Sequence, residues 1–387
     1  MARSLVALAA LLASPIFAAP GHQADDTYAH PANGICTDYT VTETVSYTKG
    51  IWTAPKPSTN FDLAAIRSSE AALEGTEVFH PLGQSKNVTD TYQLSATFCT
   101  PKKKQSGKEK TVLLASHGGG YDRRYWASTY KPKEYNFVQY ALNSGYSVFY
   151  YDRLGTGKSQ LVSGYDAQGP NQAELIAKIA QHIRAGKYTS DIKASNIALV
   201  GHSLGSVFSV GAIIAHPDIA EAVVLTGAAL PNSTDPSRIL RPLSLTFQNG
   251  LLANTMGYAR DSGYAAFGDI YAHASAFFHM PYDVPTIQYA QNISQPVSLV
   301  EMLSAASIRF EASAYKGSVM LTSGEWDILA CGGHCAPRYD YGLQNKTFEG
   351  AKAVETYLHP GAGHGVNFAR NATGFYGKII DFVNRRV

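Results

Sequence analysis

The sequence predicts an α/β protein, with a mostly parallel central sheet, helices on both faces and an inserted helical lid. Three observations lead to this fold class. Short, continuous apolar runs alternate with amphipathic segments of helical spacing from Val112 onwards. Continuous apolar runs are typical of parallel strands that are buried on both faces. The alternation stops between Pro231 and about Tyr315 and then resumes, which indicates an insertion into a single large domain.

The chain begins with a predicted secretory signal peptide over residues 1–19. Arg3 precedes an apolar run at residues 5–12, and small residues stand at Ala18 and Ala19. This run is shorter than the roughly 18 apolar residues of a membrane-spanning helix, and no later segment reaches that length, so we expect no membrane span. The mature protein is expected to be secreted and extracellular.

Residues 20–110 are predicted to form an N-terminal extension that carries the first strands of the domain. Residues 39–47 and 92–98 read as strands, and residues 62–75 have helical spacing. The basic stretch at residues 102–110 is better explained as a solvated loop than as a binding patch.

Two stretches, residues 111–230 and 316–387, are predicted to form the core, separated by the helical lid at residues 231–315. In the first stretch we expect strands at residues 112–115, 148–151, 197–200 and 221–226, and helices at 137–142, at 173–183 and after Ser203. In the second we expect strands at residues 318–322 and 354–358 and a helix at 375–383. No strand is predicted within the lid.

Cysteines and glycosylation sequons both fit a secreted chain. The Asn-x-Ser/Thr sequons are Asn87, Asn232, Asn292, Asn345 and Asn371. Four cysteines allow three pairings in an oxidising compartment, of which we favour Cys36–Cys99 and Cys331–Cys335. The alternative is a zinc site made of Cys331, His334 and Cys335. Three ligands within five residues lack the separated pairs of structural zinc sites, so we expect no metal here.

The charge composition argues against polyanion binding. A formal net charge of +2 with 16% charged residues provides no strong field for nucleic acid or anionic membranes. The 45% of apolar residues in a chain of 387 residues is enough for one large core.

The segment GHSLG, Gly201–Gly205, lies between the predicted strand at residues 197–200 and a helix. This is the context that the G-x-S-x-G pattern requires, because the glycines leave room for a sharp turn that lifts the serine out of the sheet. The first N–H groups of the helix, and its dipole, can stabilise an oxyanion. Ser203 is therefore the predicted nucleophile.

A base and an orienting acid are predicted after two later strands. GEWD ends at Asp327 and follows the strand at 318–322, and GAGHG contains His364 and follows the strand at 354–358. With Ser203, they give the order Ser, Asp, His, all at the carboxyl ends of parallel strands. Glu325 is an alternative acid. His359 is an alternative base, although its place beside the strand and before Pro360 suits a structural role better.

The glycine-rich segment SHGGGYD, residues 116–122, directly follows the strand at 112–115. Its backbone N–H groups can face a substrate oxygen without hindrance from side chains. Gly118 and Gly119, together with Leu204 after the nucleophile, form the predicted oxyanion hole. Tyr121 is a predicted substrate-binding residue. The neighbouring Arg123 and Arg124 either hold an acidic substrate group or are ordinary exposed loop arginines, and the second reading is more common.

These segments together resemble the α/β-hydrolase family, in particular its secreted, lid-bearing serine esterase-like members. SHGGG, DRLGTGKS, GHSLG, GEWD and GAGHG occur in the family's order and spacing over about residues 111–387. DRLGTGKS begins at Asp152, and its tail matches the end of the phosphate-loop pattern, but Asp152 replaces the first glycine of that pattern and would repel phosphate. The segment is similar to the family's D-x-x-G-x-G-x-S loop instead. The extension before residue 111 is longer than the family's minimal pattern.

The resemblance and the residues together predict a secreted serine hydrolase that cleaves carboxylic esters or lactones through an acyl-enzyme, without a cofactor. The predicted lid is rich in large apolar residues: Phe247, Tyr258, Phe267, Tyr271, Phe277, Phe278 and Met280. Of these, Phe277 and Phe278 are predicted to bind substrate, which favours apolar or aromatic esters, although the rings could instead only hold the lid's own core. A lid-bearing serine aminopeptidase or amidase, or a non-catalytic glycosylated binding protein on the same fold, are the alternatives.

Overall fold

The computed structural model describes residues 28–71, 80–105, 107–190, 192–229, 247–249, 260–305, 307–339 and 342–387. Several sequence predictions lie wholly or partly outside these residues: the signal peptide at residues 1–19, the sequon at Asn232, the side chain of Tyr258, the end of the predicted helix at 62–75 and part of the predicted lid at 231–315.

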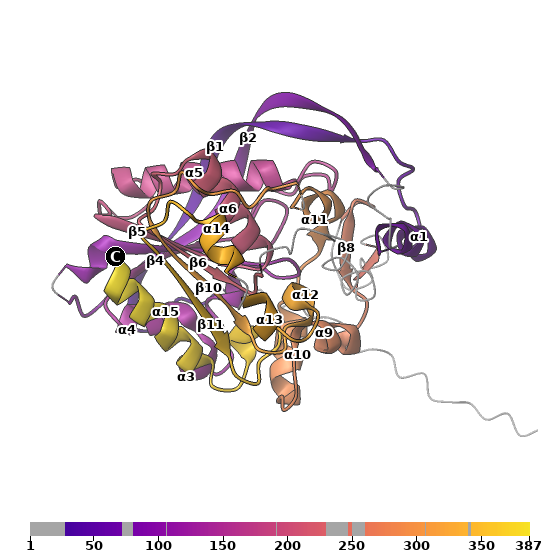
Figure 1. The fold of residues 1–387 in the computed structure, drawn as a ribbon. Coiled ribbons are helices and arrows are strands. Elements are labelled where there is room, and N and C mark those ends of the chain that lie inside the picture. Colours follow the sequence, from indigo (N-terminus) through magenta and orange to yellow (C-terminus); the bar gives the residue numbers. More distant parts are fainter. Residues whose placement is uncertain are drawn as a thin grey trace, which may run out of the picture.

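An eight-stranded, mostly parallel sheet forms the centre of the molecule (Figure 1), which confirms the predicted fold class. The strand order is β1-β2-β4-β3-β5-β6-β10-β11, and the six strands from β4 to β11 run parallel. These six are β3 (Thr111–Ser116), β4 (Ser147–Tyr151), β5 (Asn196–His202), β6 (Ala222–Thr226), β10 (Ser318–Gly324) and β11 (Ala353–His359). The antiparallel strands β1 (Gly34–Trp52) and β2 (Leu82–Pro101) extend one edge.

Helices cover both faces of the sheet, and a hydrophobic core lies on each side. The helices that pack on the sheet are α4 (Phe137–Asn143), α5 (Gly169–Ala185), α6 (Leu204–Ala215) and α15 (Ala372–Arg386). Successive side chains of β3 point to opposite faces: Leu113 and Ala115 pack with residues of α4 and α15, whereas Val112 and Leu114 pack with residues of α5 and α6. Figure 1 shows the two helix pairs on opposite sides of the sheet. The continuous apolar strands are therefore buried on both faces, as the sequence predicts.

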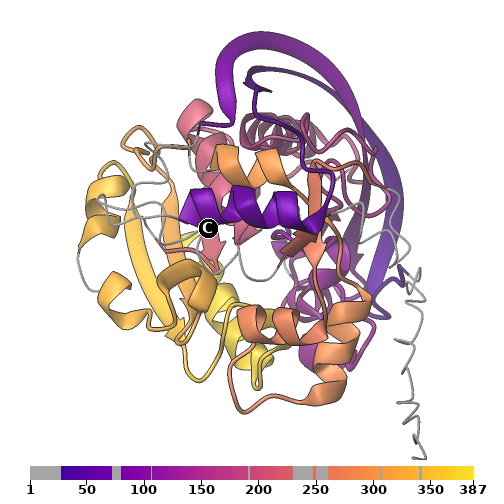
Figure 2. The same cartoon turned by 90° about the vertical axis from the view of Figure 1, so that its right-hand side faces the viewer.

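The N-terminal extension is a long hairpin arm. β1 and β2 pair from Gly34 with Pro101 to Trp52 with Leu82, so both strands, of 19 and 20 residues, are much longer than the sequence suggests. Their outer halves were not predicted because few of their side chains are apolar. The strands pair there through polar groups instead; for example, the Thr48 hydroxyl donates to Asn87 Oδ1 at 2.9 Å. The arm carries α1 (Asn60–Ala71) across to the inserted segment, where α1 contacts β7 (Figures 1 and 2).

The insertion between β6 and β10 contains a small sheet as well as helices, so the prediction that it holds no strand was wrong. β7 (Phe247–Asn249), β8 (Tyr264–Phe267) and β9 (Val297–Ser298) pair antiparallel. These strands are too short to show a clear period in the sequence. The described helices of the insertion are α9 (Ile270–Phe277), α10 (Val284–Asn292) and α11 (Leu299–Ala305).

Short helical turns complete the described fold: α3 (Pro132–Tyr135), α12 (Ile328–Cys331), α13 (Ala336–Tyr339), α14 (Leu343–Thr347), η1 (Lys108–Lys110), η2 (Arg123–Tyr125) and η4 (Val366–Phe368). Within the described residues, no helix has both the length and the hydropathy to cross a membrane.

Candidate active site

The residues singled out in the sequence come together at one edge of the sheet. Ser203 follows β5, Asp327 follows β10 and His364 follows β11, while Gly118 and Gly119 follow β3. These four strands run parallel, so their carboxyl ends lie at the same edge. This edge is the candidate active site.

Ser203 lies in a tight turn between β5 and α6. Its φ of 51° and ψ of −118° are an unusual combination for a residue with a side chain. Close packing requires the neighbouring glycines. A Cβ on Gly201 would approach the Gly205 oxygen to 2.6 Å, and a Cβ on Gly205 would approach the Ser116 oxygen to 2.3 Å. The turn holds Ser203, which is partly accessible, in the strained backbone conformation that is common at functional sites.

Asp327 and His364 form a buried pair. Asp327 Oδ2 accepts a hydrogen bond from His364 Nδ1 at 2.8 Å, and both side chains are almost fully buried. The carboxylate also accepts hydrogen bonds from Ser323 Oγ at 2.5 Å and from Ala330 N–H at 2.8 Å. Burial raises the pKa of Asp327, but the neighbouring His364 and these donors outweigh burial, and the pKa lies below its ordinary value. Asp327 is therefore a carboxylate that orients the imidazole.

The free nitrogen of His364 is available for chemistry. His364 Nε2 is buried and has no hydrogen-bond partner within the described residues. The ring lies 4.8 Å from the ring of His202, the residue before Ser203, and a Cβ on Gly227 would lie 3.2 Å from His364 Cε1. The imidazole is therefore enclosed next to the Ser203 turn, with one nitrogen committed to Asp327 and the other uncommitted.

The two alternative partners are engaged elsewhere. Glu325 Oε2 accepts a hydrogen bond from Gly361 N–H at 3.0 Å. His359 lies within 3.2 Å of the Tyr357 hydroxyl and 3.4 Å of the Arg370 carbonyl oxygen. Neither Glu325 nor His359 takes part in the Asp327–His364 pair, and both hold the loops around it.

The glycine-rich loop runs directly against the Ser203 turn. A Cβ on Gly118 would lie 2.9 Å from Ser203 Cβ, and a Cβ on Gly119 would lie 3.1 Å from Leu204 Cδ1. Within the described part of the chain, the N–H groups of Gly119 and Leu204 have no hydrogen-bond acceptor. Two backbone donors next to Ser203 are thus free to bind an oxygen atom.

Two histidines of the site were not identified from the sequence, although both stand inside quoted motifs. The ring of His202 stacks on Tyr125 at 4.4 Å, and its Nδ1 lies 3.0 Å from Thr226 Oγ1. His117 Nε2 accepts a hydrogen bond from Arg153 N–H at 3.0 Å. Burial holds the pKa of both rings well below the ordinary value, so both are neutral.

The predicted substrate-binding residues have different surroundings. The Phe277 ring packs edge-on against His364 at 4.8 Å, and Phe278 is half-buried beside it. Tyr121 is fully buried, and its hydroxyl lies 2.6 Å from His273 Nε2. His273 Nδ1 lies 2.8 Å from Gln291 Oε1, so the ring links the glycine-rich loop to α9 and α10 of the insertion. A substrate contact for these three side chains stays a prediction.

Arg123 and Arg124 are neither exposed nor available to a substrate acid, so both readings of the sequence were wrong. Only 3% and 4% of their surfaces are exposed. Arg124 pairs with Asp122 at 2.6 Å, and Arg123 lies 3.8 Å from Asp152. Both guanidinium groups also pack on the Tyr28 ring. Their charges are used to hold the turn after the glycine-rich loop, which a sequence pattern does not reveal.

Asp152 shapes a turn, as its motif predicts. Oδ1 accepts a hydrogen bond from Arg123 N–H at 3.0 Å, and Oδ2 accepts one from Lys158 N–H at 2.9 Å. Burial raises the pKa of Asp152 to about 6, although Arg123 opposes this change. Both oxygens of the carboxylate are therefore used to hold the turn.

Both favoured disulfides are present. Cys36–Cys99 joins directly paired residues of β1 and β2, and Cys331–Cys335 closes the turn after Asp327. The second bond excludes the alternative zinc site, because neither sulfur is a free thiolate. The four sequon asparagines that the structure describes, Asn87, Asn292, Asn345 and Asn371, are all exposed.

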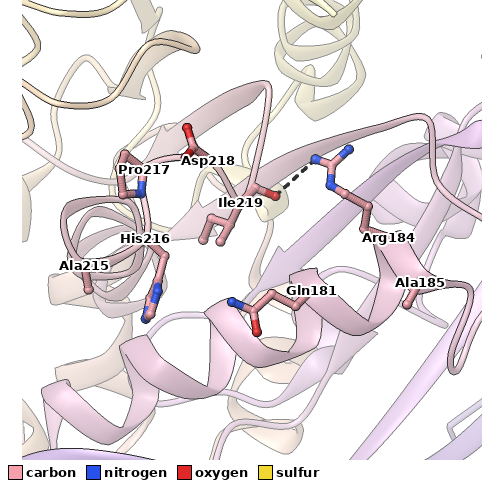
Figure 3. A pocket seen from close by; sticks show the side chains of 8 residues that line it. All are labelled: Gln181, Arg184, Ala185, Ala215, His216, Pro217, Asp218 and Ile219. Atoms are coloured by element: carbon pink, nitrogen blue, oxygen red, sulfur yellow. Dashed lines mark hydrogen bonds between the residues drawn. The ribbon is translucent and has the colours of Figure 1, made fainter.

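The surface pocket in Figure 3 is separate from the candidate active site. It has a volume of about 620 Å³ and lies between the ends of α5 and α6, where Arg184 donates a hydrogen bond to the Ile219 oxygen at 3.3 Å. Ser203 stands at the opposite end of α6. The pocket is therefore at the wrong edge of the sheet to hold a substrate of Ser203.

Comparisons with known proteins agree with the fold. The family model described as "Alpha/beta hydrolase family" matches residues 112–375. A thermophilic esterase from Thermogutta terrifontis is similar in structure, with a TM-score of 0.52 and 15% identity over 76% of this chain and 94% of the esterase. A carboxylesterase structure from the thaumarchaeon Nitrososphaera gargenis is similar with a TM-score of 0.51 and 14% identity, over 75% of this chain and 94% of the carboxylesterase. A comparison with curated protein sequences gives no match. Since the family model covers most of the chain, this protein belongs to the α/β-hydrolase family.

Proposed function

We propose that the protein is a secreted serine hydrolase that cleaves carboxylic esters or lactones through an acyl-enzyme on Ser203. The main observation behind this proposal is the buried Asp327–His364 pair beside the strained turn of Ser203. Asp327 Oδ2 and His364 Nδ1 lie 2.8 Å apart. Such an arrangement turns a weak serine nucleophile into a reactive one. The similarity in fold to two structures that are named as esterases also supports ester cleavage.

The proposed reaction uses the atoms already described. Ser203 Oγ attacks the ester carbonyl carbon, and His364 Nε2 accepts the serine proton. Asp327 stabilises the imidazolium that forms, and the N–H groups of Gly119 and Leu204 donate hydrogen bonds to the oxyanion. As the C–O bond breaks, His364 gives its proton to the leaving alcohol. Water then repeats these steps on the acyl-enzyme and releases the acid.

Secretion is supported by covalent features of the chain that lie outside the candidate active site. Two disulfides and exposed sequon asparagines are typical of an oxidising compartment. We propose that residues 1–19 are removed during export.

An apolar substrate is proposed from the insertion. Phe277 contacts the imidazole, and Phe278 is the half-buried neighbour that can extend this apolar wall. Phe278→Ala is expected to change KM and acyl-chain preference in a normally folded enzyme. Unchanged preference together with a lower melting temperature would restrict Phe278 to packing.

The test of the nucleophile is covalent labelling. A fluorophosphonate should add once per chain, at Ser203, and abolish turnover of p-nitrophenyl esters, while Ser203→Ala should lose both labelling and turnover. Parallel assays with lactones and aminoacyl amides separate an esterase from an aminopeptidase. Turnover that survives in Ser203→Ala would overturn the proposal, and a folded chain without turnover or labelling would favour a binding protein.

A further inference from the structure

The carbonyl oxygen of Gly118 is held by two donors. His117 Nδ1 lies 2.8 Å from it, and Arg153 Nη2 donates to it at 3.1 Å. Because His117 Nε2 accepts a hydrogen bond from Arg153 N–H, the proton of this neutral ring is on Nδ1 and points to Gly118. Both donors therefore fix the direction of one carbonyl group in the glycine-rich loop.

That carbonyl belongs to the same peptide unit as the Gly119 N–H. A trans peptide is planar, and its N–H points opposite to its C=O. Fixing the direction of the Gly118 oxygen therefore also fixes the direction of the Gly119 N–H, in a loop whose Cα atoms pack against Ser203 at Gly118 and against Leu204 at Gly119. A hydrogen bond from a cation to the carbonyl also polarises the peptide unit, which strengthens its N–H as a donor.

The side chain of Arg153 is held in turn by the insertion. Arg153 Nη1 donates to Oε1 of Glu301 on α11, and both residues are at most 1% exposed. Gln172 Nε2 donates to the same oxygen at 2.7 Å, and the guanidinium lies over the Phe208 ring, 5.3 Å from its centre. A continuous path of contacts thus connects α11 of the insertion to the Gly118–Gly119 peptide.

We infer that Arg153 and Glu301 are positioning residues that aim the Gly119 N–H at the oxyanion, so that docking of α11 completes the oxyanion hole. The inference rests on the proposed acyl transfer at Ser203. A role in stability alone explains the pair poorly, because replacing a buried ion pair by apolar side chains is often neutral or stabilising. Arg153 donates to Glu301 through Nη1 and to the Gly118 oxygen through Nη2. The pair therefore acts on the peptide of the oxyanion hole as well as on the packing of α11.

The test separates catalysis from folding with four variants. Glu301→Gln, Arg153→Lys, Arg153→Met and the double variant Arg153→Met with Glu301→Leu are compared by kcat, KM and melting temperature. Active sites are counted with a fluorophosphonate. Loss of an oxyanion donor costs about 100- to 1000-fold in kcat. A misaimed donor should therefore cost about 10- to 100-fold in kcat per active site, with KM changed less than threefold. Arg153→Lys should retain more activity than Arg153→Met.

A trifluoromethyl ketone inhibitor provides the specific readout. Its adduct with the serine places an oxyanion in the hole, so its Ki should rise by the factor by which kcat/KM falls. Glu221→Gln is the matched control, because Glu221 pairs with Arg184 at 2.9 Å, far from the site, and this variant should behave as wild type. The double variant should stay folded yet lose activity.

Two outcomes oppose the inference in different ways. If Ser203 is labelled in the wild type but the variants keep kcat and inhibitor affinity within twofold, the positioning role is overturned and the proposed function stands. If Ser203 is not labelled and Ser203→Ala keeps full turnover, the proposed function fails, and the inference fails with it.

Discussion

At the scale of single residues, the site depends on imidazole rings that are kept neutral by burial. His117, His202 and His273 are each fully buried, and burial lowers the pKa of all three. Neutral rings can both donate and accept, and the chain uses this property to link loops that come from distant parts of the sequence. His273 is the link between Tyr121 in the glycine-rich loop and Gln291 in α10.

The neutral state of His273 predicts acid sensitivity. Burial lowers its pKa to about 3 in the folded protein, whereas an unfolded chain has an imidazole pKa of about 6.5. The unfolded state therefore binds more protons between these values. The contribution of His273 to stability is fully present above pH about 6.5 and is lost progressively as the pH falls towards 3.

His273→Gln should therefore flatten the dependence of unfolding free energy on pH between 4 and 6, by up to about 1.4 kcal/mol per pH unit. Denaturant unfolding of wild type and variant at several pH values measures this slope. His334→Gln, at an exposed surface histidine, is the control and should follow the wild-type curve. Equal slopes in His273→Gln and the wild type would show that His273 gains its proton without unfolding.

At the scale of elements, the turn after β10 determines where Asp327 stands. Gly333 N–H donates to the Asp327 carbonyl oxygen at 3.0 Å, and Cys335 N–H donates to that of Glu325 at 3.0 Å. Cys331–Cys335 joins the last residue of α12, whose N-cap is Asp327 itself, to the chain that follows the helix. The disulfide therefore bounds the segment that presents the carboxylate to His364.

Removal of this bond by Cys331→Ala with Cys335→Ala should affect activity more than folding. The bond spans a sequence separation of 4, so the chain-entropy model gives it only about 2 kcal/mol. Because a displaced Asp327 no longer holds the His364 ring, kcat should fall about tenfold. Ester turnover per labelled active site and the melting temperature measure the two effects. A large loss of melting temperature with unchanged kcat contradicts this role.

At the scale of the whole molecule, the parts that could be predicted are those with a local sequence signal. Most strands of the core are continuous apolar runs, and Ser203 and Asp327 each follow one of them, whereas His364 follows β11, a partly exposed edge strand of mixed composition. The parts of the fold that could not be predicted depend on contacts between residues far apart in the sequence. The outer halves of β1 and β2 are stabilised by cross-strand pairing, and β7 to β9 become strands only through one another. Likewise, Arg153 gains its role from Glu301, which lies 148 positions further along the chain.

The other disulfide concerns the whole molecule, because it joins the start of β1 to the end of β2 at the base of the N-terminal arm. Cys36 pairs with Cys99 across β1 and β2, and Cys99 in turn pairs with Val148 near the start of β4. The candidate active site lies at the other end of the parallel strands, after Ser116 in β3. Removal of Cys36–Cys99 should therefore lower the free energy of unfolding without changing kcat or KM.

Cys36→Ala with Cys99→Ala is expected to lower the free energy of unfolding by about 4 kcal/mol, since the bond closes a sequence separation of 63 residues. At a temperature where the variant is still folded, kcat and KM should remain within twofold of wild type. Denaturant unfolding and ester turnover, measured beside the Cys331–Cys335 variant, give the comparison. The variant without Cys36–Cys99 should lose mainly stability, and the variant without Cys331–Cys335 should lose mainly kcat. If removal of Cys36–Cys99 lowers kcat as strongly as removal of Cys331–Cys335, the arm also controls the active site, and the separation of stability from chemistry is wrong.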